Sequence, residues 1–388
     1  MRKFSIACAV TNGVKITNTN PMPTSDTPRI LFLSRAYPPV TGGIENQNYE
    51  ISRALARRVP CTVIANKHGK RALPLFLPYA LIVTLWNMRT HDVLLLGDGV
   101  LGIIGGFVKI FYGNRKKVLC IVHGLDLTFN NNIYQNFWVK QFIPDADRLI
   151  AVGNQTIKEG VTRGIPEEKF VFVPNGVDVK KFALGTPDRK ALSVLLKKDL
   201  SDDTRVLFTG GRLVKRKGVA WFIRTILPTL PDNIIYAVAG DGPDRTNIEA
   251  AIRENGMQDR VVLLGYVSDD DRRTLLHSCD LFIQPNIPVE GDMEGFGLVV
   301  LEAGSSGIVV VASRLEGLKD AIHDGKNGIL VPPEDADAWK ETVITLLSDD
   351  DKRTAMGRAA HEYITKHFTW DAIAARYVEV IEQTPARR

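Results

Sequence analysis

The chain has 388 residues, of which 45% are hydrophobic and 24% are charged, and its formal net charge is +5. This length exceeds what one hydrophobic core usually serves, so we expect two domains. The composition excludes a largely disordered chain and is typical of a soluble α/β protein. The basic residues are scattered and their excess is small, which argues against a nucleic-acid-binding protein.

The cysteine pattern indicates the compartment. The chain has four cysteines with no CxxC spacing: Cys8, Cys61, Cys120 and Cys279. Unpaired cysteines of this kind fit a reducing environment, so we expect a cytoplasmic protein. The apolar stretch from Phe4 to Val10 is too short for a secretory signal, and we expect residues 1–27 to form a flexible extension.

The most hydrophobic internal stretch runs from Ala72 to Met88 and contains Pro74 and Pro78. It is shorter than the ~20 residues that a membrane-spanning helix needs. Two interpretations remain: a helix buried in the core, or a helix lying on an anionic membrane surface. Three basic residues precede it, Lys67, Lys70 and Arg71.

From residue 28 onward the sequence alternates between strand and helix patterns. Apolar runs predict strands over residues 29–34, 61–65, 93–96, 117–122, 148–152 and 170–173. Helical patterns between these runs, such as residues 44–58, indicate parallel strands joined by crossovers. Residues 28–185 are therefore predicted to form a Rossmann-like domain, which we expect to bind an acceptor.

The apolar strands stop over residues 186–203, where we expect a linker. The pattern then resumes with strands over residues 205–209, 234–239, 260–264, 280–284, 308–312 and 328–331. Helices are predicted over residues 218–227, 244–254, 269–278, 297–305, 337–348 and 351–367. The fold class is thus α/β, with two doubly wound Rossmann-like domains facing across a cleft, where open parallel sheets bind ligands. We expect the second domain to span residues 204–370 and residues 371–388 to form a helix that returns to the first domain.

Two carboxylates and two glycines mark the start of the helix predicted at 297–305. The stretch reads Glu294-Gly295-Phe296-Gly297-Leu298, and Glu302 follows about two turns later. Free amides and the positive dipole end at a helix start favour phosphate. The carboxylates can accept hydrogen bonds from sugar hydroxyls. A simple acid–dipole interaction and a solvated Glu302 explain the same residues.

A basic turn follows the first strand of the second domain. It contains Arg212, with a planar fork of donors, and Lys217, with a compact charge, a suitable pair for a diphosphate. Lys215 and Arg216 in the same turn are predicted to be solvated. In the first domain His123 follows a predicted strand. Gly42 and Gly43 also follow a strand, where their amides can face a phosphate or an acceptor.

On these residues the chain resembles the retaining glycosyltransferases of family GT4, which have the two-domain GT-B fold. The stretch from Glu294 to Ala303 is similar to the family's Glu-x7-Glu motif, and Gly211 to Gly218 resembles its Gly-Arg-Leu-x-x-x-Lys-Gly motif. His123-Gly124 resembles its strand-His-Gly motif, and Gly42-Gly43 its Gly-Gly pair. The resemblance covers roughly Arg29 to the C-terminus.

The resemblance implies a retaining, metal-independent hexosyltransferase that uses a UDP- or GDP-linked sugar and needs no cofactor. Its implied catalytic residues are His123, Arg212, Lys217 and Glu294. Its implied donor-binding residues are Gly42, Gly43, Arg212, Lys217, Tyr266, Val267, Glu294, Gly295, Phe296, Gly297, Leu298 and Glu302. Tyr266 and Val267 fall where the family holds the nucleotide base through backbone contacts.

The acceptor is expected to be a saccharide, in one interpretation linked to a polyprenyl or other lipid and used for surface polysaccharide or lipopolysaccharide. The protein would then contact the inner face of the cytoplasmic membrane peripherally. No metal site is predicted, because the two Asp-x-Asp stretches, at 145–147 and 335–337, do not follow strands.

Two departures from the family bear on the donor sugar. The segment from Arg314 to Asp320 replaces a glycine-rich run, and Asn286 stands where a serine is usual. Glu290 and Asp292 also crowd the approach to Glu294. Two other functions remain open: a sugar-nucleotide epimerase of the same fold, and a non-catalytic scaffold that binds nucleotide sugars.

Overall fold

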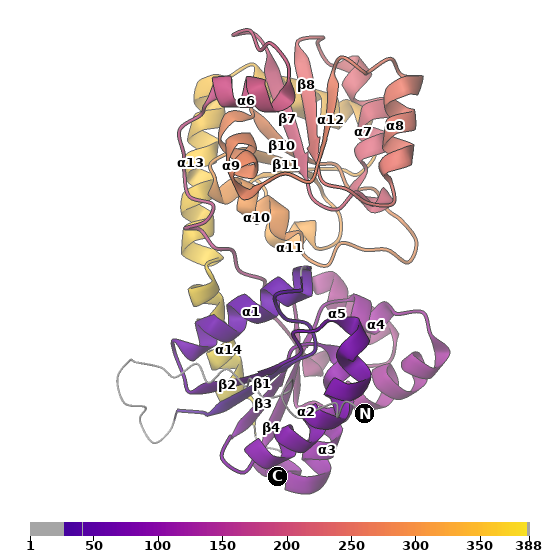
Figure 1. The fold of residues 1–388 in the computed structure, drawn as a ribbon, viewed down its shortest axis with the longest axis vertical. Coiled ribbons are helices and arrows are strands. Elements are labelled where there is room, and N and C mark those ends of the chain that lie inside the picture. Colours follow the sequence, from indigo (N-terminus) through magenta and orange to yellow (C-terminus); the bar gives the residue numbers. More distant parts are fainter. Residues whose placement is uncertain (1–26, 41, 386–388) are drawn as a thin grey trace, which may run out of the picture. The chain divides into compact units, whose positions relative to one another are not determined.

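The computed structural model describes residues 27–40 and 42–385, which form two compact units (Figure 1). The first unit contains the described residues up to Val152, Thr156–Val173 and the stretch from Ile373. The second contains Gly153–Gln155 and Pro174–Ala372. The extension predicted for residues 1–27 lies almost wholly outside the described residues.

The first unit is built on a six-stranded parallel sheet. In spatial order its strands are β2 (Cys61–Ala65), β1 (Ile30–Ser34), β3 (Val93–Leu96), β4 (Lys117–Val122), β5 (Arg148–Ala151) and β6 (Phe170–Phe172). Residues of β1 and β3 are buried on both faces, as the continuous apolar runs predict. The register places Ile30 between Cys61 and Val93.

Helices flank this sheet. They are α1 (Gly43–Ala56), α2 (Leu73–Asn87), α3 (Gly102–Tyr112), α4 (Leu125–Thr128), η5 (Tyr134–Phe142), α5 (Asn154–Thr162) and α14 (Trp370–Gln383), with short turns η2 (Lys70–Ala72), η3 (Gly99–Leu101), η4 (Gly113–Arg115) and η6 (Glu167–Lys169). The last helix joins this unit, since the Lys117 ammonium donates to the carbonyl of Ile381 at 2.8 Å.

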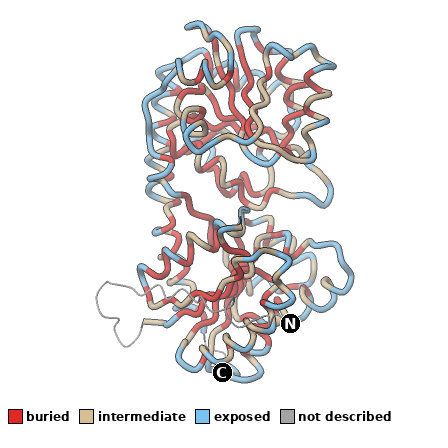
Figure 2. The backbone as a smooth tube through the Cα atoms, viewed as in Figure 1, coloured by how far each residue is buried: buried red, intermediate tan, exposed pale blue. Residues whose placement is uncertain are grey.

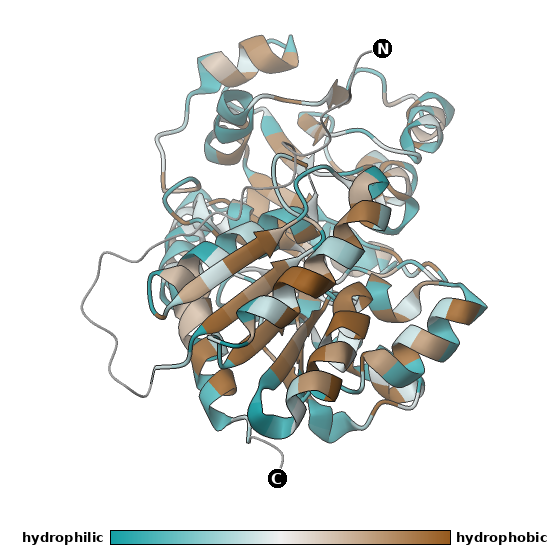
Figure 3. Ribbon diagram, turned by 60° about the horizontal axis from the view of Figure 1, so that its bottom comes forward, coloured by the Kyte–Doolittle hydropathy of each residue, from teal (hydrophilic) through white to brown (hydrophobic). Residues whose placement is uncertain are grey.

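The second unit also contains a six-stranded parallel sheet. Its spatial order is β12 (Ile329–Val331), β11 (Val309–Ser313), β10 (Leu281–Gln284), β7 (Arg205–Gly210), β8 (Ile234–Ala239) and β9 (Val261–Gly265). The strands of both sheets are the most continuously buried parts of the chain (Figure 2) and are predominantly apolar (Figure 3).

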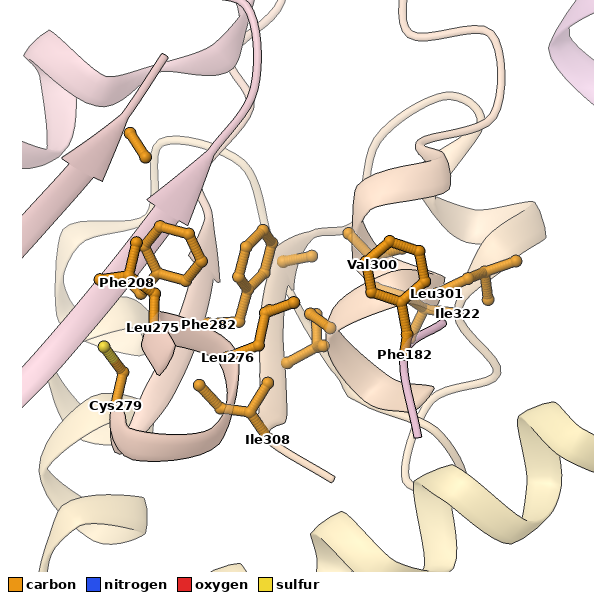
Figure 4. Packing of buried hydrophobic residues seen from close by; sticks show 14 of the residues in the cluster. Phe182, Phe208, Leu275, Leu276, Cys279, Phe282, Val300, Leu301, Ile308 and Ile322 are labelled. Atoms are coloured by element: carbon orange, nitrogen blue, oxygen red, sulfur yellow. The ribbon is translucent and has the colours of Figure 1, made fainter. Parts of the chain in front are cut away.

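Helices cover both faces of the second sheet. They are α6 (Arg189–Leu196), α7 (Val219–Thr225), α8 (Arg245–Glu254), α9 (Asp269–Ser278), α10 (Leu298–Ser305), α11 (Leu318–Ala321), α12 (Ala336–Leu347) and α13 (Asp350–His367), with turns η7 (Lys215–Lys217) and η8 (Leu227–Thr229). On one face Leu275 and Val300 join Phe208 and Phe282 in a single apolar cluster (Figure 4). This cluster fixes α9 and α10 against the strands whose ends carry the site.

The predicted fold class is confirmed: both units are doubly wound α/β layers with parallel sheets. Every predicted strand is present, and its ends lie within a single residue of the predicted bounds. Residues 186–203, expected to be a linker, contain the helix α6, because Leu192 and Leu196 are spaced by one turn and are both buried.

Candidate active site

The candidate site lies at the carboxyl edge of the second sheet. Strands β11, β10 and β7 are neighbours, so the loops that follow them emerge side by side. The loop after β7 carries the predicted basic turn, and the loop after β10 leads to Glu294 and the start of α10. The loop after β11 contains the segment from Arg314 that departs from the family pattern.

Glu294 is the centre of this edge. Its Oε2 atom receives the Lys217 ammonium at 2.5 Å, the Arg216 guanidinium at 2.5 Å and the Asn286 side-chain amide at 3.3 Å. Glu294 is 8% exposed and Lys217 is 7% exposed. The predicted residues Lys217 and Glu294 are therefore brought into direct contact.

The charge state of this pair follows from its surroundings. Burial alone would raise the pKa of the Glu294 carboxyl, but the charges of Lys217 and Arg216 and the hydrogen bonds from Lys217 and Asn286 lower that pKa to about 2. Burial lowers the pKa of the Lys217 ammonium, and the charge of Glu294 opposes this. Since Glu294 is ionised above pH 2, we expect Lys217 to keep its proton at neutral pH.

The backbone positions Lys217 through the glycine that follows it. Gly218 has φ of 67°, and a Cβ atom there would lie 1.9 Å from the carbonyl oxygen of Pro285. Only glycine fits this close approach between the loops after β7 and β10. The resulting turn, η7, ends at Lys217 and directs it inward, while Lys215 two residues earlier is exposed.

Arg216 corrects the sequence analysis. It was predicted to be solvated, but its side chain is only 18% exposed and pairs with Glu294 and with Asp292, whose Oδ1 lies 3.0 Å from the Arg216 Nε. The reason is the acidic approach to Glu294, which offers this guanidinium two carboxylates. The sequence signal for this role is Asp292, which crowds the approach to Glu294.

Asn286 is the second residue whose role the sequence did not reveal. It is 1% exposed, donates to Glu294 and accepts from the Gln284 amide at 2.5 Å. A serine, which the family pattern has at this position, would offer a hydroxyl on a shorter side chain in place of this amide. Asn286 therefore ties Glu294 to the end of β10.

The loop from Glu294 to Gly297 is held against the segment after β11. The Glu294 N–H donates to the Glu316 carboxylate at 2.6 Å, and the Gly317 N–H donates to the Glu294 carbonyl at 3.1 Å. Gly297 then caps the start of α10 with φ of 83°, and Phe296 is buried in the core below. Leu298 is the first residue of that helix, and the predicted amide-rich helix start is thus formed.

Arg212 and Glu302 are not joined to the Glu294 cluster. Arg212 is exposed, and no ion pair or hydrogen bond to its side chain is found in the described part of the chain. Glu302 instead pairs with Arg272 of α9, whose guanidinium also lies 4.9 Å from the Phe182 ring centroid. Burial raises the pKa of Glu302, although Arg272 opposes the shift. Tyr266, after β9, is exposed, and Val267 packs partly against the core.

The other predicted residues belong to the first unit. His123 follows β4, and its Nε2 lies 2.9 Å from the carbonyl oxygen of Gly97. Asp126 fixes this loop, because its Oδ1 accepts the N–H groups of His123 and Gly124, each at 2.9 Å. Gly43 is the first residue of α1, and Gly42 precedes it in an extended conformation.

The described residues contain neither a metal-binding cluster nor a membrane-spanning helix. Residues 27–40 and 42–385 include no group of three or more His, Cys, Asp or Glu side chains arranged to hold a metal ion. Over the same residues no helix combines the length and the apolar character that crossing a bilayer requires.

Comparison with known proteins identifies the class and the family. Residues 196–363 match the domain described as glycosyl transferases group 1, and residues 41–181 match glycosyltransferase family 4. With two Rossmann-like units, this defines a glycosyltransferase of the GT-B fold. The chain belongs to family GT4, which confirms the family and the enzyme class expected from its motifs.

The chain is also similar to three individual proteins. It is 27% identical over 279 residues to the GDP-mannose-dependent alpha-(1-6)-phosphatidylinositol monomannoside mannosyltransferase of Mycobacterium tuberculosis, covering 70% of this chain and 71% of that protein. It is 26% identical over 381 residues to the Mycolicibacterium smegmatis protein of the same name, covering 91% and 98%. HepE of Anabaena, solved in complex with UDP, shares the fold with a TM-score of 0.71 at 19% identity, covering 91% and 99%.

Proposed function

We propose that this glycosyltransferase is retaining and metal-independent, and that it moves a hexose from a UDP- or GDP-linked donor to a saccharide acceptor. The observation that carries the proposal is the contact of Lys217 and Arg216 with Glu294 at the carboxyl edge of the second sheet. Two cations and a carboxylate in one buried cluster suit a donor that has both a diphosphate and sugar hydroxyls.

The cations supply the electrostatic part of the reaction. As the bond between the anomeric carbon and the diphosphate oxygen breaks, its electron pair remains on the diphosphate, and negative charge grows there. Lys217, Arg216 and the exposed Arg212 can stabilise this charge, together with the amides at the start of α10. Glu294 keeps the cations in place before the donor arrives and offers an acceptor to the sugar hydroxyls.

Retention requires the new bond to form on the face that the diphosphate leaves. The acceptor hydroxyl oxygen attacks the anomeric carbon through an oxocarbenium-like state, and its proton passes to the leaving phosphate. This route rests on the family resemblance. His123, Gly42 and Gly43, in the first unit, would contact the donor or acceptor. Tyr266 and Val267 would hold the nucleotide base, and Glu302 would accept hydrogen bonds from sugar hydroxyls.

The proposed acceptor is lipid-linked, as in surface polysaccharide or lipopolysaccharide assembly, because the first unit carries an exposed apolar surface. On α2 the side chains of Leu75, Ile82 and Trp86 recur on one face and are 82%, 69% and 68% exposed. On the neighbouring helix α3, Ile110 and Phe111 are 76% and 66% exposed. The mycobacterial relatives are named for phosphatidylinositol mannoside acceptors.

Basic residues accompany this surface. The Arg89 guanidinium lies 4.3 Å from the Trp86 ring centroid, and Arg115 follows α3. Cations beside exposed apolar side chains suit an anionic lipid surface, where the enzyme would rest on the cytoplasmic face of the membrane. We expect sedimentation with anionic vesicles at low salt, and its loss in Trp86→Glu. No sedimentation of the wild-type protein at low salt would contradict this part of the proposal.

The first experiment measures thermal stability in EDTA with UDP, GDP, ADP and their sugar conjugates. A ligand at about one hundred times its Kd should stabilise the protein by roughly 2.7 kcal/mol. A shift with one nucleotide supports metal-free diphosphate binding and names the base. Release of that nucleotide only when an acceptor is present distinguishes transfer from epimerisation. Binding without turnover on any acceptor would favour a scaffold, and no shift at all would contradict the donor site.

A further inference from the structure

Glu316 has a backbone conformation that amino acids with side chains seldom adopt. Its φ is 46°, in the left-handed region that favours glycine. It lies between β11 and α11, in the segment that departs from the family pattern. Such an outlier persists only where its surroundings hold it, and it then points to a functional constraint.

Two other residues in the described part of the chain that are not glycine share this conformation, and both have local reasons for it. Lys197 ends α6, where a left-handed residue commonly terminates a helix. Glu334 lies exposed in the turn before α12. Glu316 differs because its carboxylate enters the candidate site and accepts the N–H of Glu294 at 2.6 Å.

The next residue completes the attachment. The Gly317 N–H donates to the carbonyl of Glu294 at 3.1 Å. Gly317 packs so closely that a Cβ atom there would lie 2.4 Å from the carbonyl oxygen of Gly295. Two consecutive residues after β11 therefore hold both peptide groups of Glu294, one through a side chain and one through the backbone.

We propose that Glu316 is a positioning residue for Glu294. This inference rests on the proposed function, in which Glu294 meets the donor sugar. Glycine would relieve the backbone strain at position 316, but it would offer no acceptor to the Glu294 N–H. Glu316 therefore acts on the part of donor recognition that depends on the sugar, and not on the part that depends on the nucleotide.

Three substitutions separate the hydrogen bond from the strain. Glu316→Gln keeps an oxygen that can accept the Glu294 N–H, so its kcat/KM for the nucleotide sugar should stay within about threefold of wild type. Glu316→Ala and Glu316→Gly both lose the acceptor and should lose about tenfold in kcat/KM. Their affinity for the nucleoside diphosphate without sugar should remain at the wild-type value. Glu316→Gly should also melt above Glu316→Ala, because it relieves the strain.

Glu334 provides the matched control. It is the same residue type in the same left-handed conformation, with φ of 58°. Glu334→Gly should melt above Glu334→Ala in the same way, while both variants keep wild-type kcat/KM.

Wild-type kcat/KM in Glu316→Ala and Glu316→Gly would overturn the inference. So would a loss in Glu316→Gln as large as in Glu316→Ala, or a parallel loss of affinity for the nucleoside diphosphate. These outcomes differ from failure of the proposed function, in which the wild-type protein itself turns over no nucleotide sugar.

Discussion

The second unit has two clusters of acidic and basic side chains, one at each edge of its sheet. At the carboxyl edge Glu294 meets Lys217 and Arg216 at 2.5 Å, and its pKa falls to about 2. At the amino edge Asp280 has three arginines around it, at 3.4 to 3.8 Å, and its pKa is nevertheless raised, chiefly by burial.

Contact distance explains the opposite shifts. The arginines lie 3.4 to 3.8 Å from the Asp280 oxygens, where their attraction is weaker than that of the charge-assisted contacts of Glu294 at 2.5 Å. Burial therefore dominates at Asp280, although its carboxylate also accepts the Val206 N–H at 2.7 Å. Two arginines of the amino edge make shorter hydrogen bonds elsewhere: Arg353 donates to the Asp350 carboxylate at 2.5 Å and to the carbonyl of Leu346 at 2.7 Å, and Arg189 donates to that of Thr204 at 2.8 Å. They line a pocket of about 640 Å³. The two edges thus differ in how closely each carboxylate contacts its cations.

The largest effect that we expect from this contrast is the loss of kcat in the variant Lys217→Ala. In the proposed function this buried cation stabilises the departing diphosphate, so its removal should lower kcat by about 10²- to 10³-fold at saturating donor. Steady-state kinetics would measure it, with Lys215→Ala on the same turn as the control, since Lys215 is exposed. Near-wild-type turnover of Lys217→Ala would contradict the diphosphate assignment.

At the amino edge we expect the reverse outcome. Arg353 is buried and bonded to Leu346, Asp350 and Asp280, so Arg353→Ala should lower the free energy of unfolding by about 2 kcal/mol. This corresponds to a Tm lower by about 4–8 °C for a domain of this size. The kcat/KM of the remaining folded enzyme should not change. A catalytic loss without a loss of stability would place function at this edge.

Arg216→Ala should have a smaller effect than Lys217→Ala, because Lys217 and Asn286 still hold Glu294. We expect kcat/KM to fall about tenfold, the value of one hydrogen bond to a charged group. Arg216→Lys should restore part of the loss, because it keeps the charge without the planar fork. Activity equal to wild type in Arg216→Ala would return this residue to the solvated role that the sequence suggested.

The smallest effect concerns acid stability. The folded-state pKa of Glu294, about 2, lies below its ordinary 4.5, so Glu294 contributes stability above pH 4.5 that is lost as the pH falls toward 2. Asp280 has a raised pKa, so its contribution to the free energy of unfolding changes in the opposite direction: it increases as the pH falls, because the buried charge is neutralised. Chemical unfolding should be measured between pH 5 and pH 2.5. As the pH falls, the free energy of unfolding should decrease less steeply in Glu294→Gln than in wild type, and more steeply in Asp280→Asn.

The fold was largely predictable because parallel strands buried on both faces give continuous apolar runs. The motifs of Lys217 and Glu294 were both predicted to contact the donor, but the direct contact between the two side chains was not predicted. It follows from the neighbouring positions of β7 and β10 in the sheet. Arg216, Asn286 and Glu316 were not predicted. Their roles depend on close approaches between three loops. The role of Glu316 also depends on a positive φ, which amino acids other than glycine seldom adopt.

The position of α14 in the sequence has a consequence for folding during translation. Tyr377 of α14 is buried and bonded to Gln47 of α1, and Ile381 receives Lys117. The first unit therefore contains segments from both ends of the described chain, and the second unit lies between them in sequence. During translation the second unit can fold while the first still lacks its final helix. Completion of the first unit must await the emergence of α14 from the ribosome.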